Sequence, residues 1–217
     1  MSELATTDQR YVPAAGRRAL TALYDPAMRL TMREGTWRPK LLRRLTSGSP
    51  ESVLDVGCGT GTLAIDLARA GLRTIGIDGD PDVLRRAAEK AREAGVELDL
   101  RKGLADAIPL VDVSVDRVVC SLVLHHLPLA TKTRTLAECR RVLRPGGRLV
   151  VADWGRATDP LARAGFLGLQ LLDGFETTRD HAAGRIPGLI ADAGFSVSEF
   201  DRIRTAWGTL ELLEAHR

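Results

Sequence analysis

Short apolar runs of strand length alternate along the chain with longer segments whose apolar residues recur at helical spacing. Five of the short runs predict strands, and each begins, ends or is bounded at polar residues or glycine. They cover residues 52–57, 73–78, 96–103, 116–124 and 148–154. Helices are predicted between them over residues 62–71, 80–95 and 130–147. The second helix has Asp80 to cap its start, Pro81 at its first position and Gly95 to end it.

This alternation predicts an α/β fold with a doubly wound, mostly parallel sheet. Parallel strands joined by helices need right-handed crossovers, which place helices on both faces of the sheet. The rhythm changes in the last third, where residues 157–193 are helical and irregular. Residues 195–203 and 204–216 then predict two late strands with a short link, typical of an antiparallel pair that finishes the sheet.

A glycine-rich turn follows the first predicted strand in the stretch "LDVGCGTG", residues 54–61. Its glycines, Gly57, Gly59 and Gly61, allow positive φ angles and a close approach of the backbone to a ligand. The helix that begins after them offers unpaired N–H groups and a partial positive charge. Phosphates and carboxylates both suit such a place, so the turn predicts a cofactor site.

Two classes of cofactor fit a strand, a glycine turn and a helix. The dinucleotide fingerprint G-x-G-x-x-G is not met, because residue 62 is Thr and the third glycine comes one residue early. Asp55 would repel a pyrophosphate, whereas it would attract the ammonium and sulfonium groups of S-adenosylmethionine. Asp78 comes seventeen residues after Gly61, where an acid binds the ribose in either class. The alternative role of Asp78 is to cap the following helix.

Four stretches in order resemble the motifs of class I S-adenosylmethionine-dependent methyltransferases. The resemblance is strongest to the group that includes the ubiquinone/menaquinone C-methyltransferases and related small-molecule and lipid methyltransferases. The stretches are "LDVGCGTG", "GIDGDP", "SVDRVVCSLVLHHL" and "LRPGGRLVVADW", and the resemblance extends over residues 52–154. The resemblance implies a Rossmann-like sheet of seven strands whose order reverses beside the first, with an antiparallel last strand. It also implies an N-terminal helical cap over residues 1–46 and a domain over 50–217, with a lid insertion at 157–193.

The same resemblance implies a set of residues that contact S-adenosylmethionine or its product, S-adenosyl-L-homocysteine. They are Asp55, Gly57, Cys58, Gly59, Gly61, Asp78, Gly79, Leu104, Ala105, Asp106, Ser121 and Tyr24. The chain departs from the family after the third strand, where Gly-Asp-Ala is common and this sequence has Gly-Leu-Ala. Leu104 therefore stands where an Asp would bind the adenine amino group. Asp106 either supplies that acceptor or only caps a turn.

Candidate catalytic residues follow the fourth and fifth strands. His125 and His126 lie at the predicted carboxyl edge of the sheet, and Asp153 ends the fifth strand beside them. A methyl transfer gains most of its rate from positioning, and it needs a base only when the acceptor carries a proton of high pKa. Either histidine or Asp153 would serve as that base, or the histidines are structural. His181 lies in a stretch that would cover the substrate.

The length of the chain and its cysteines limit the classes of protein to which it can belong. A chain of 217 residues with 44% hydrophobic residues is expected to form one domain with appended helices. No apolar run approaches the roughly 20 residues of a membrane span, and the first residues lack the features of a signal peptide. The three cysteines are spaced neither for zinc nor for a disulfide framework. We therefore expect reduced thiols, a cytoplasmic location and no bound metal.

The net charge of +3 is small but concentrated near the N-terminus. Residues 10–44 contain nine Arg or Lys and two acidic residues, a local net charge of +7. Interleaved with leucines, these charges predict either a solvated helix face or peripheral contact with an anionic membrane. The apolar lid favours a small apolar or lipid-like acceptor. The alternatives are a nucleic-acid methyltransferase, a catalytically silent cofactor-binding subunit and, more distantly, a nicotinamide oxidoreductase.

Overall fold

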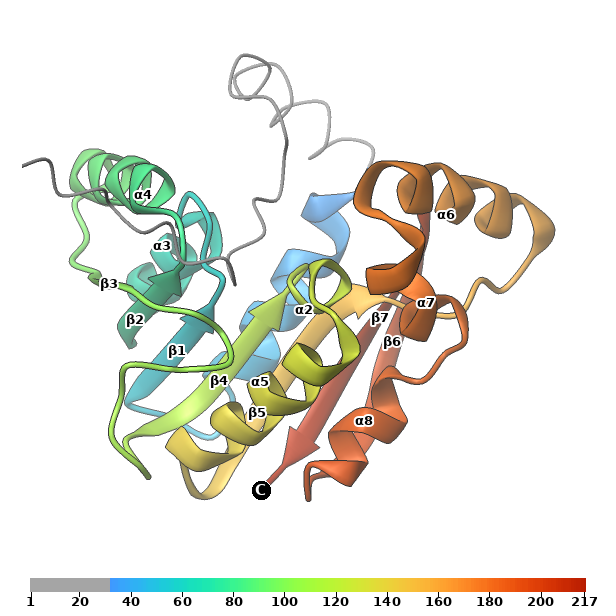
Figure 1. Cartoon of the computed structure of the whole chain (residues 1–217). Coiled ribbons are helices and arrows are strands. Elements are labelled where there is room, and N and C mark those ends of the chain that lie inside the picture. The colour runs from blue at the N-terminus through green and yellow to red at the C-terminus, as the bar shows by residue number, and fades with distance from the viewer. Residues whose placement is uncertain (1–31) are drawn as a thin grey trace, which may run out of the picture.

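A seven-stranded sheet runs through residues 32–217, the part of the chain that the computed structural model describes (Figure 1). Its strands are β1 (Ser52–Val56), β2 (Arg73–Asp78), β3 (Asp99–Lys102), β4 (Val115–Ser121), β5 (Leu143–Trp154), β6 (Ser196–Thr205) and β7 (Gly208–His216). Their order is β3-β2-β1-β4-β5-β7-β6. Strand β7 pairs antiparallel with both β5 and β6, and the other neighbours are parallel. The predicted fold class, the reversal beside β1 and the antiparallel finish are confirmed.

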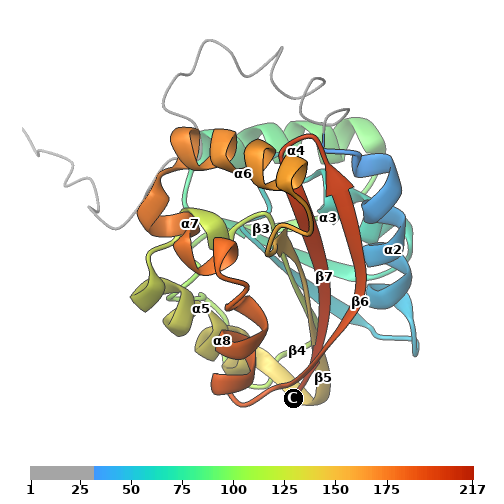
Figure 2. The ribbon, with the colours of Figure 1, turned by 90° about the vertical axis from the view of Figure 1, so that its right-hand side faces the viewer.

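Helices cover both faces of the sheet (Figure 2). On one face lie α2 (Glu34–Thr46), α3 (Thr62–Arg69) and α4 (Pro81–Ala94). On the other face lie α5 (Leu129–Val142) and α8 (Ile186–Asp192). The short 3-10 helix η1 (Leu124–His126) and the helices α6 (Pro160–Asp173) and α7 (Phe175–Ala182) lie at the carboxyl edge of the sheet. None of the helices within residues 32–217 is long and apolar enough to cross a membrane.

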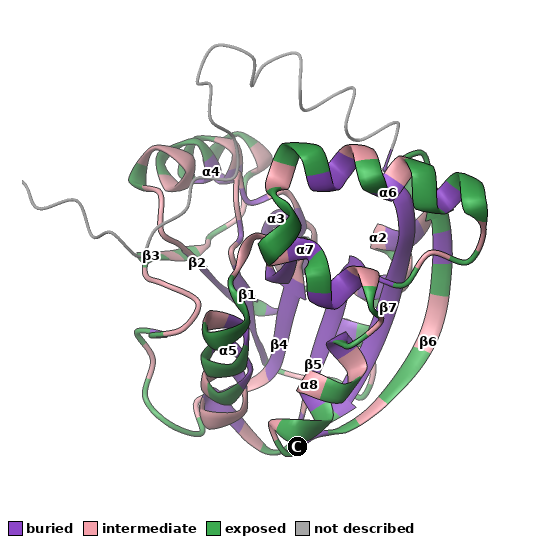
Figure 3. Cartoon of the chain, turned by 45° about the vertical axis from the view of Figure 1, so that its right-hand side comes forward, coloured by how far each residue is buried: buried purple, intermediate pink, exposed green. Residues whose placement is uncertain are grey.

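The central strands are buried on both sides, as parallel strands covered by helices require (Figure 3). Every residue of β1 is buried. Its side chains alternate between two cores, because successive residues of a strand point to opposite faces. Leu54 and Val56 pack with residues of α5 and α8, whereas Val53 packs with residues of α2 and α3. Polar side chains on these strands are therefore expected only where a strand meets a ligand or a partner.

The local signals around α4 are confirmed. The Asp80 carboxylate accepts hydrogen bonds from the N–H groups of Asp82 and Val83 at the start of the helix. Pro81 occupies the first helical position, and Gly95 ends the helix with a φ angle of 68°. Each of these choices depends on neighbouring residues alone, so they are readable from the sequence.

The described part of the predicted N-terminal cap, residues 32–46, is a layer of the domain. Trp37, Leu41 and Leu45 of α2 recur every fourth residue, and all three are buried against the sheet. Lys40 pairs with Asp201, and Arg44 Nη1 lies 3.2 Å from Glu214 Oε2, so much of the basic charge of α2 is balanced. This balance counts against nucleic-acid binding through α2, and its apolar stripe is not free for a membrane. The rest of the proposed membrane contact and Tyr24 lie outside the described residues.

The predicted lid insertion divides into two parts. Helices α6 and α7 lie over the carboxyl edge, where a lid is expected (Figure 1). Helix α8 instead packs on the face of the sheet, because Ile186 and Ile190 are buried in the same core as β4 and β5. Lys132 links α7 to α5. Its fully buried ammonium donates hydrogen bonds to Thr177 O at 2.6 Å and to Asp180 Oδ2 at 3.1 Å.

The packing of α2 yields a stability prediction. Replacing Leu41 by Ala leaves a cavity between α2 and the sheet, so we expect the free energy of unfolding to fall by about 2–5 kcal/mol. Arg43→Ala, at an exposed position of the same helix, is the control and is expected to change it by less than about 0.5 kcal/mol. Urea unfolding measures both. Equal midpoints for Leu41→Ala and the unmodified protein would contradict the packing.

Candidate active site

The glycine turn after β1 needs its glycines for conformation and for space. Gly57, Gly59 and Gly61 have φ angles of 66°, 55° and 73°. A Cβ on Gly57 would come within 2.5 Å of the Val123 side chain, whereas a Cβ on Gly59 would meet nothing within 4 Å. The turn is thus packed on one side against the segment after β4 and open on the other. Its open side adjoins the start of α3, where an anionic group is stabilised.

Asp78 ties the end of β2 to this turn. Its Oδ2 atom accepts a hydrogen bond from Gly59 N–H at 3.1 Å, and its Oδ1 atom accepts one from Asp80 N–H at 3.0 Å. Asp80 supplies the cap of α4, so the helix-capping alternative for Asp78 is wrong. A carboxylate fixed in this way keeps lone pairs for two ribose hydroxyls. The ribose role stays a prediction.

Asp55 lies in β1 with an exposed fraction of 2%. Burial and the neighbouring charge of Asp78 raise its pKa to about 8. Within residues 32–217 its carboxylate makes no hydrogen bond or ion pair. A buried carboxylate without a partner is unfavourable, and a bound cation would offset that cost. The ammonium and sulfonium of S-adenosylmethionine carry such charge, so the residues present fit this cofactor.

The surroundings of two other predicted cofactor residues, Cys58 and Asp106, do not decide what these residues contact in the cofactor. Cys58 is a buried free thiol whose pKa is raised by burial and by the charges of Asp55 and Asp78, so it stays protonated. The Asp106 Oδ2 atom accepts hydrogen bonds from Arg134 Nε at 3.0 Å and Arg134 Nη2 at 2.8 Å. Four further candidates are partly exposed near the ends of β2, β3 and β4: Gly79, Leu104, Ala105 and Ser121. The role of each in adenine or ribose binding remains a prediction.

The structure brings His125 and Asp153 together at the carboxyl edge. The Nδ1 atom of His125 lies 2.8 Å from Asp153 Oδ1. Asp153 also accepts hydrogen bonds from the N–H groups of Leu124 and Trp154, both at 2.8 Å. Because an ionised carboxylate only accepts, we assign the proton of the neutral ring to Nδ1. The Nε2 atom of His125 is then the one with a free lone pair.

These partners determine the charge of Asp153. Burial alone would raise its pKa, but the neighbouring imidazoles of His125 and His181 and the hydrogen bonds from His125 and Trp154 N–H hold it below the ordinary value. Asp153 therefore stays ionised as the partner of His125. A carboxylate with a lowered pKa and this many donors is a weak base. The environment thus favours His125 over Asp153 for the base that the sequence left open.

His126 and His181 complete a cluster of three imidazoles. The ring centroids of His125 and His126 lie 3.9 Å apart. Burial and the neighbouring His125 imidazole lower the pKa of His126 to about 3. His181, on α7, is fully buried, its Nε2 lies 3.5 Å from Asp153 Oδ1, and burial lowers its pKa to about 3. Both rings are therefore neutral at pH 7.

Sequence reasoning missed Asp173, the last residue of α6. Its Oδ2 atom lies 3.7 Å from His125 Nε2, and burial raises its pKa. The only local signal was a carboxylate at the end of an apolar helix, just before Gly174. Nothing in that pattern says that the helix end meets a histidine nearly fifty residues earlier in the chain, so only the fold reveals the contact.

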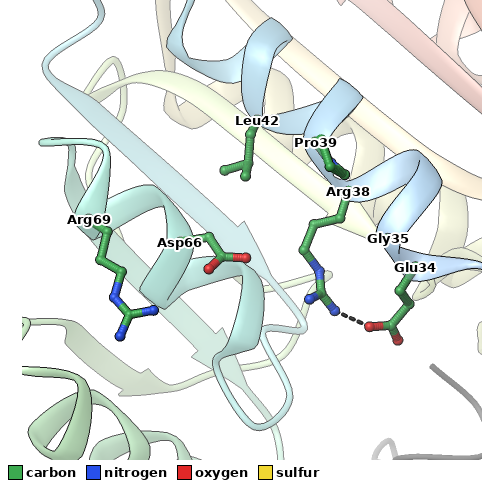
Figure 4. A pocket seen from close by; sticks show the side chains of 7 residues that line it. All are labelled: Glu34, Gly35, Arg38, Pro39, Leu42, Asp66 and Arg69. Carbon is green, nitrogen blue, oxygen red and sulfur yellow. Dashed lines mark hydrogen bonds and ion pairs between the residues drawn. The ribbon is translucent and has the colours of Figure 1, made fainter. Parts of the chain in front are cut away.

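A cavity of about 310 Å³ lies elsewhere, between α2 and α3 (Figure 4). Arg38 and Leu42 line it from α2, and Asp66 and Arg69 line it from α3. Arg38 is paired with Glu34 at its rim. None of the residues predicted to bind cofactor or acceptor lines this cavity, and its side chains form no catalytic constellation. It lies between the packed helices α2 and α3.

Comparison with known proteins agrees with this geometry. Residues 53–147, which carry the glycine turn, Asp78 and both histidines of η1, match the family described as methyltransferase domain. This match and the relatives described below support a class I S-adenosylmethionine-dependent methyltransferase domain within the chain. S-adenosylmethionine is the cofactor of this class, which agrees with the fit of the buried Asp55.

Two curated relatives of this methyltransferase domain act in quinone biosynthesis by name. The ubiquinone/menaquinone biosynthesis C-methyltransferase of Syntrophotalea carbinolica is 30% identical over 158 residues, which cover 72% of this chain and 62% of that protein. The demethylmenaquinone methyltransferase of Deinococcus radiodurans is 36% identical over 120 residues, covering 54% of this chain and 49% of that protein. The chain thus spans about half to two thirds of these relatives.

A solved structure shares the fold of this methyltransferase domain. The magnesium protoporphyrin IX methyltransferase of Synechocystis PCC 6803, solved with bound SAH, superposes with a TM-score of 0.70 at 22% identity. The superposition covers 88% of this chain and 86% of that chain. At this identity the likeness is one of fold.

Asp78 generates the first binding prediction. Asp78→Ala is expected to weaken S-adenosylmethionine binding by about 1–3 kcal/mol, because ribose hydroxyls would lose their acceptor. Isothermal titration measures this, with Asp112→Asn, an exposed loop carboxylate, as the control that should bind normally. An unchanged affinity in Asp78→Ala would mean that Asp78 only ties β2 to the glycine turn.

Asp55 generates a pH prediction. Its raised pKa means that the folded protein without cofactor holds a proton that the unfolded chain releases, between the ordinary carboxyl value of 3.8 and about 8. Stability should therefore fall as pH rises across this window. A cationic cofactor needs the ionised form, so affinity for S-adenosylmethionine should rise as pH increases through about 8.

Asp55→Asn removes the titrating group and should flatten both dependences, whereas Asp112→Asn should keep them. Calorimetric titration and urea unfolding across this pH range measure the two effects. Identical pH profiles for Asp55→Asn and the unmodified protein would show that Asp55 does not face the cofactor.

Proposed function

We propose that this protein transfers a methyl group from S-adenosylmethionine to a small acceptor at the carboxyl edge of the sheet. One observation carries the proposal: the cofactor turn and the histidine site adjoin each other. Gly57 packs against Val123, two residues before His125, so a single segment borders both sites. A donor held by the turn and an acceptor held beside His125 would therefore meet along this segment.

The cofactor, when bound, supplies a methyl carbon activated by its sulfonium group. The chain's own contribution is to hold that carbon and the acceptor atom in line, which accounts for most of the barrier reduction in such displacements. Asp55, Asp78 and the glycine turn would orient the donor. The η1 segment and the helices α6 and α7 would orient the acceptor and exclude water.

His125 is the base in this proposal, and Asp153 is its positioning residue. The 2.8 Å contact fixes the proton on Nδ1 and directs the Nε2 lone pair away from Asp153. Nε2 would accept the proton that the acceptor loses, and Asp153 would stabilise the imidazolium that forms. General base catalysis of this kind contributes about 10²–10⁴-fold in rate.

We propose an apolar or lipid-like acceptor of the quinone type. Helices α6 and α7 carry apolar side chains that are more than two fifths exposed, including Leu167, Leu171, Leu172 and Phe175. An apolar lid surface favours an apolar ligand over a nucleic-acid base. The names of the two quinone-pathway relatives support the same class of acceptor.

Isotope labelling tests the acceptor class. The protein would be added to a bacterial lysate with S-adenosylmethionine labelled in its methyl group, and labelled products would be separated by extraction into organic solvent. We expect the label in apolar small molecules. Label in nucleic acid would overturn the acceptor class, and no label above a sample that lacks the protein would favour a silent cofactor-binding subunit.

His125 generates the catalytic prediction. His125→Ala should lower turnover at least about a hundredfold and leave cofactor affinity unchanged, because the base acts only on the acceptor's proton. His216→Ala, which removes an exposed histidine at the chain's end, is the matched control and should keep full turnover. Single-turnover rates and calorimetric titration measure the two quantities. Full turnover in His125→Ala would mean that positioning alone drives the transfer.

A further inference from the structure

The cluster at the edge of the sheet contains ligand atoms that do not bind one another. His125, His126 and Asp173 each offer one such atom, and these atoms all lie within 4.8 Å of one another. His125 Nε2 and Asp173 Oδ2, at 3.7 Å, are too far apart for a hydrogen bond. Within the described chain these three residues form the one grouping of this kind. Lone pairs that face a common space are stabilised by a cation placed between them.

The set of atoms selects the kind of cation. Two imidazole nitrogens and one carboxylate oxygen suit a first-row transition metal ion such as Zn²⁺, whereas Mg²⁺ and Ca²⁺ prefer oxygen ligands alone. Three protein ligands also leave one position open, as in other catalytic or exchangeable zinc sites. Bonds of about 2.1 Å in a tetrahedron need ligand atoms about 3.4 Å apart, so atoms that lie within 4.8 Å of one another must close by up to about 1.4 Å.

The surroundings of His125 are those of a metal-bound histidine. Its Nδ1 is held by Asp153, and a carboxylate on the far nitrogen fixes the ring and makes Nε2 a stronger donor to a metal. Asp153 is itself held by two backbone N–H groups. The nearby buried cation, Lys132, is paired with Asp180 at 3.1 Å.

We propose that His125, His126 and Asp173 form a binding site for a divalent transition metal ion, with Zn²⁺ as the reference ion. The ligands come from η1 and from the end of α6, so the bound ion would fasten this helix end to the edge of the sheet. It would also occupy the Nε2 lone pair of His125. This second consequence rests on the proposed function: a metal-loaded protein would lose its base, and methyl transfer would require the metal-free form.

Metal binding is tested without cofactor or acceptor, so its outcome is independent of methyl transfer. Untagged, metal-stripped protein would be titrated with Zn²⁺ by calorimetry and with Co²⁺ by visible absorption. We expect one saturable site per chain and a cobalt band in the visible. His126→Ala and Asp173→Asn should each weaken binding at least about tenfold. His216→Ala and Asp192→Asn, which remove an exposed histidine and an exposed carboxylate, should bind normally.

Absence of saturable binding would overturn the proposal, and so would unchanged affinity in Asp173→Asn. That variant keeps the shape of the side chain, so it decides the matter if circular dichroism shows that His126→Ala does not fold. In the methyl-transfer assay Zn²⁺ should inhibit and a chelator should restore the rate, and Asp173→Asn should need at least about tenfold more Zn²⁺ for the same inhibition. Zn²⁺ binding without inhibition would keep the site and overturn its effect on the base.

Discussion

Burial of carboxylates at the ends of fully buried parallel strands is the constraint on which the site depends. The sheet is covered on both faces, so a carboxylate on β1 or β5 has lost its water and needs another source of positive charge. Asp153 finds hydrogen-bond donors within the chain, in His125 Nδ1–H and two backbone N–H groups, and its pKa is lowered. Asp55 finds no such partner among residues 32–217, and its pKa is raised to about 8. Two similar residues on one sheet edge are thus prepared for different roles.

This difference divides the carboxyl edge into a donor side and an acceptor side. On the donor side, the glycine turn and Asp78 form a preorganised cradle whose missing element is positive charge, which the cofactor of this domain class carries. On the acceptor side, Asp153 already accepts hydrogen bonds from His125 and two backbone N–H groups, and His125 keeps one nitrogen for a ligand. Val123 lies between the two sides and packs against Gly57, so a shift of η1 would affect both.

The helices after β5 complete the acceptor side and explain why it is buried. Lys132 holds α7 through Thr177 and Asp180, and α7 in turn places His181 against Asp153. The end of α6 places Asp173 opposite His125. The acceptor side is assembled from β5, η1, α6 and α7, so its geometry depends on where α6 and α7 lie. The donor side is built on the ends of β1 and β2 and on the glycine turn.

Much of the donor side was determined by the sequence itself. Positive φ at Gly57 and Gly59, the cap at Asp80 and the stop at Gly95 depend on residues within one turn, and the period of apolar residues fixed the order of strands and helices. The residues that bind adenine were predictable only in part. Leu104 stands where the family commonly has an Asp, and no nearby residue pattern indicates which group takes the place of that carboxylate.

Only the tertiary structure shows which residues meet at the acceptor side. Asp173 and Lys132 look like ordinary residues of an apolar helix and a solvated helix, and their partners lie more than forty residues away in the chain. The role of Asp153 was likewise open, because a carboxylate's pKa depends on which donors surround it in space. Sequence fixes local backbone geometry through short-range sterics and hydrogen bonds, whereas burial and long-range charge contacts exist only once the chain has folded.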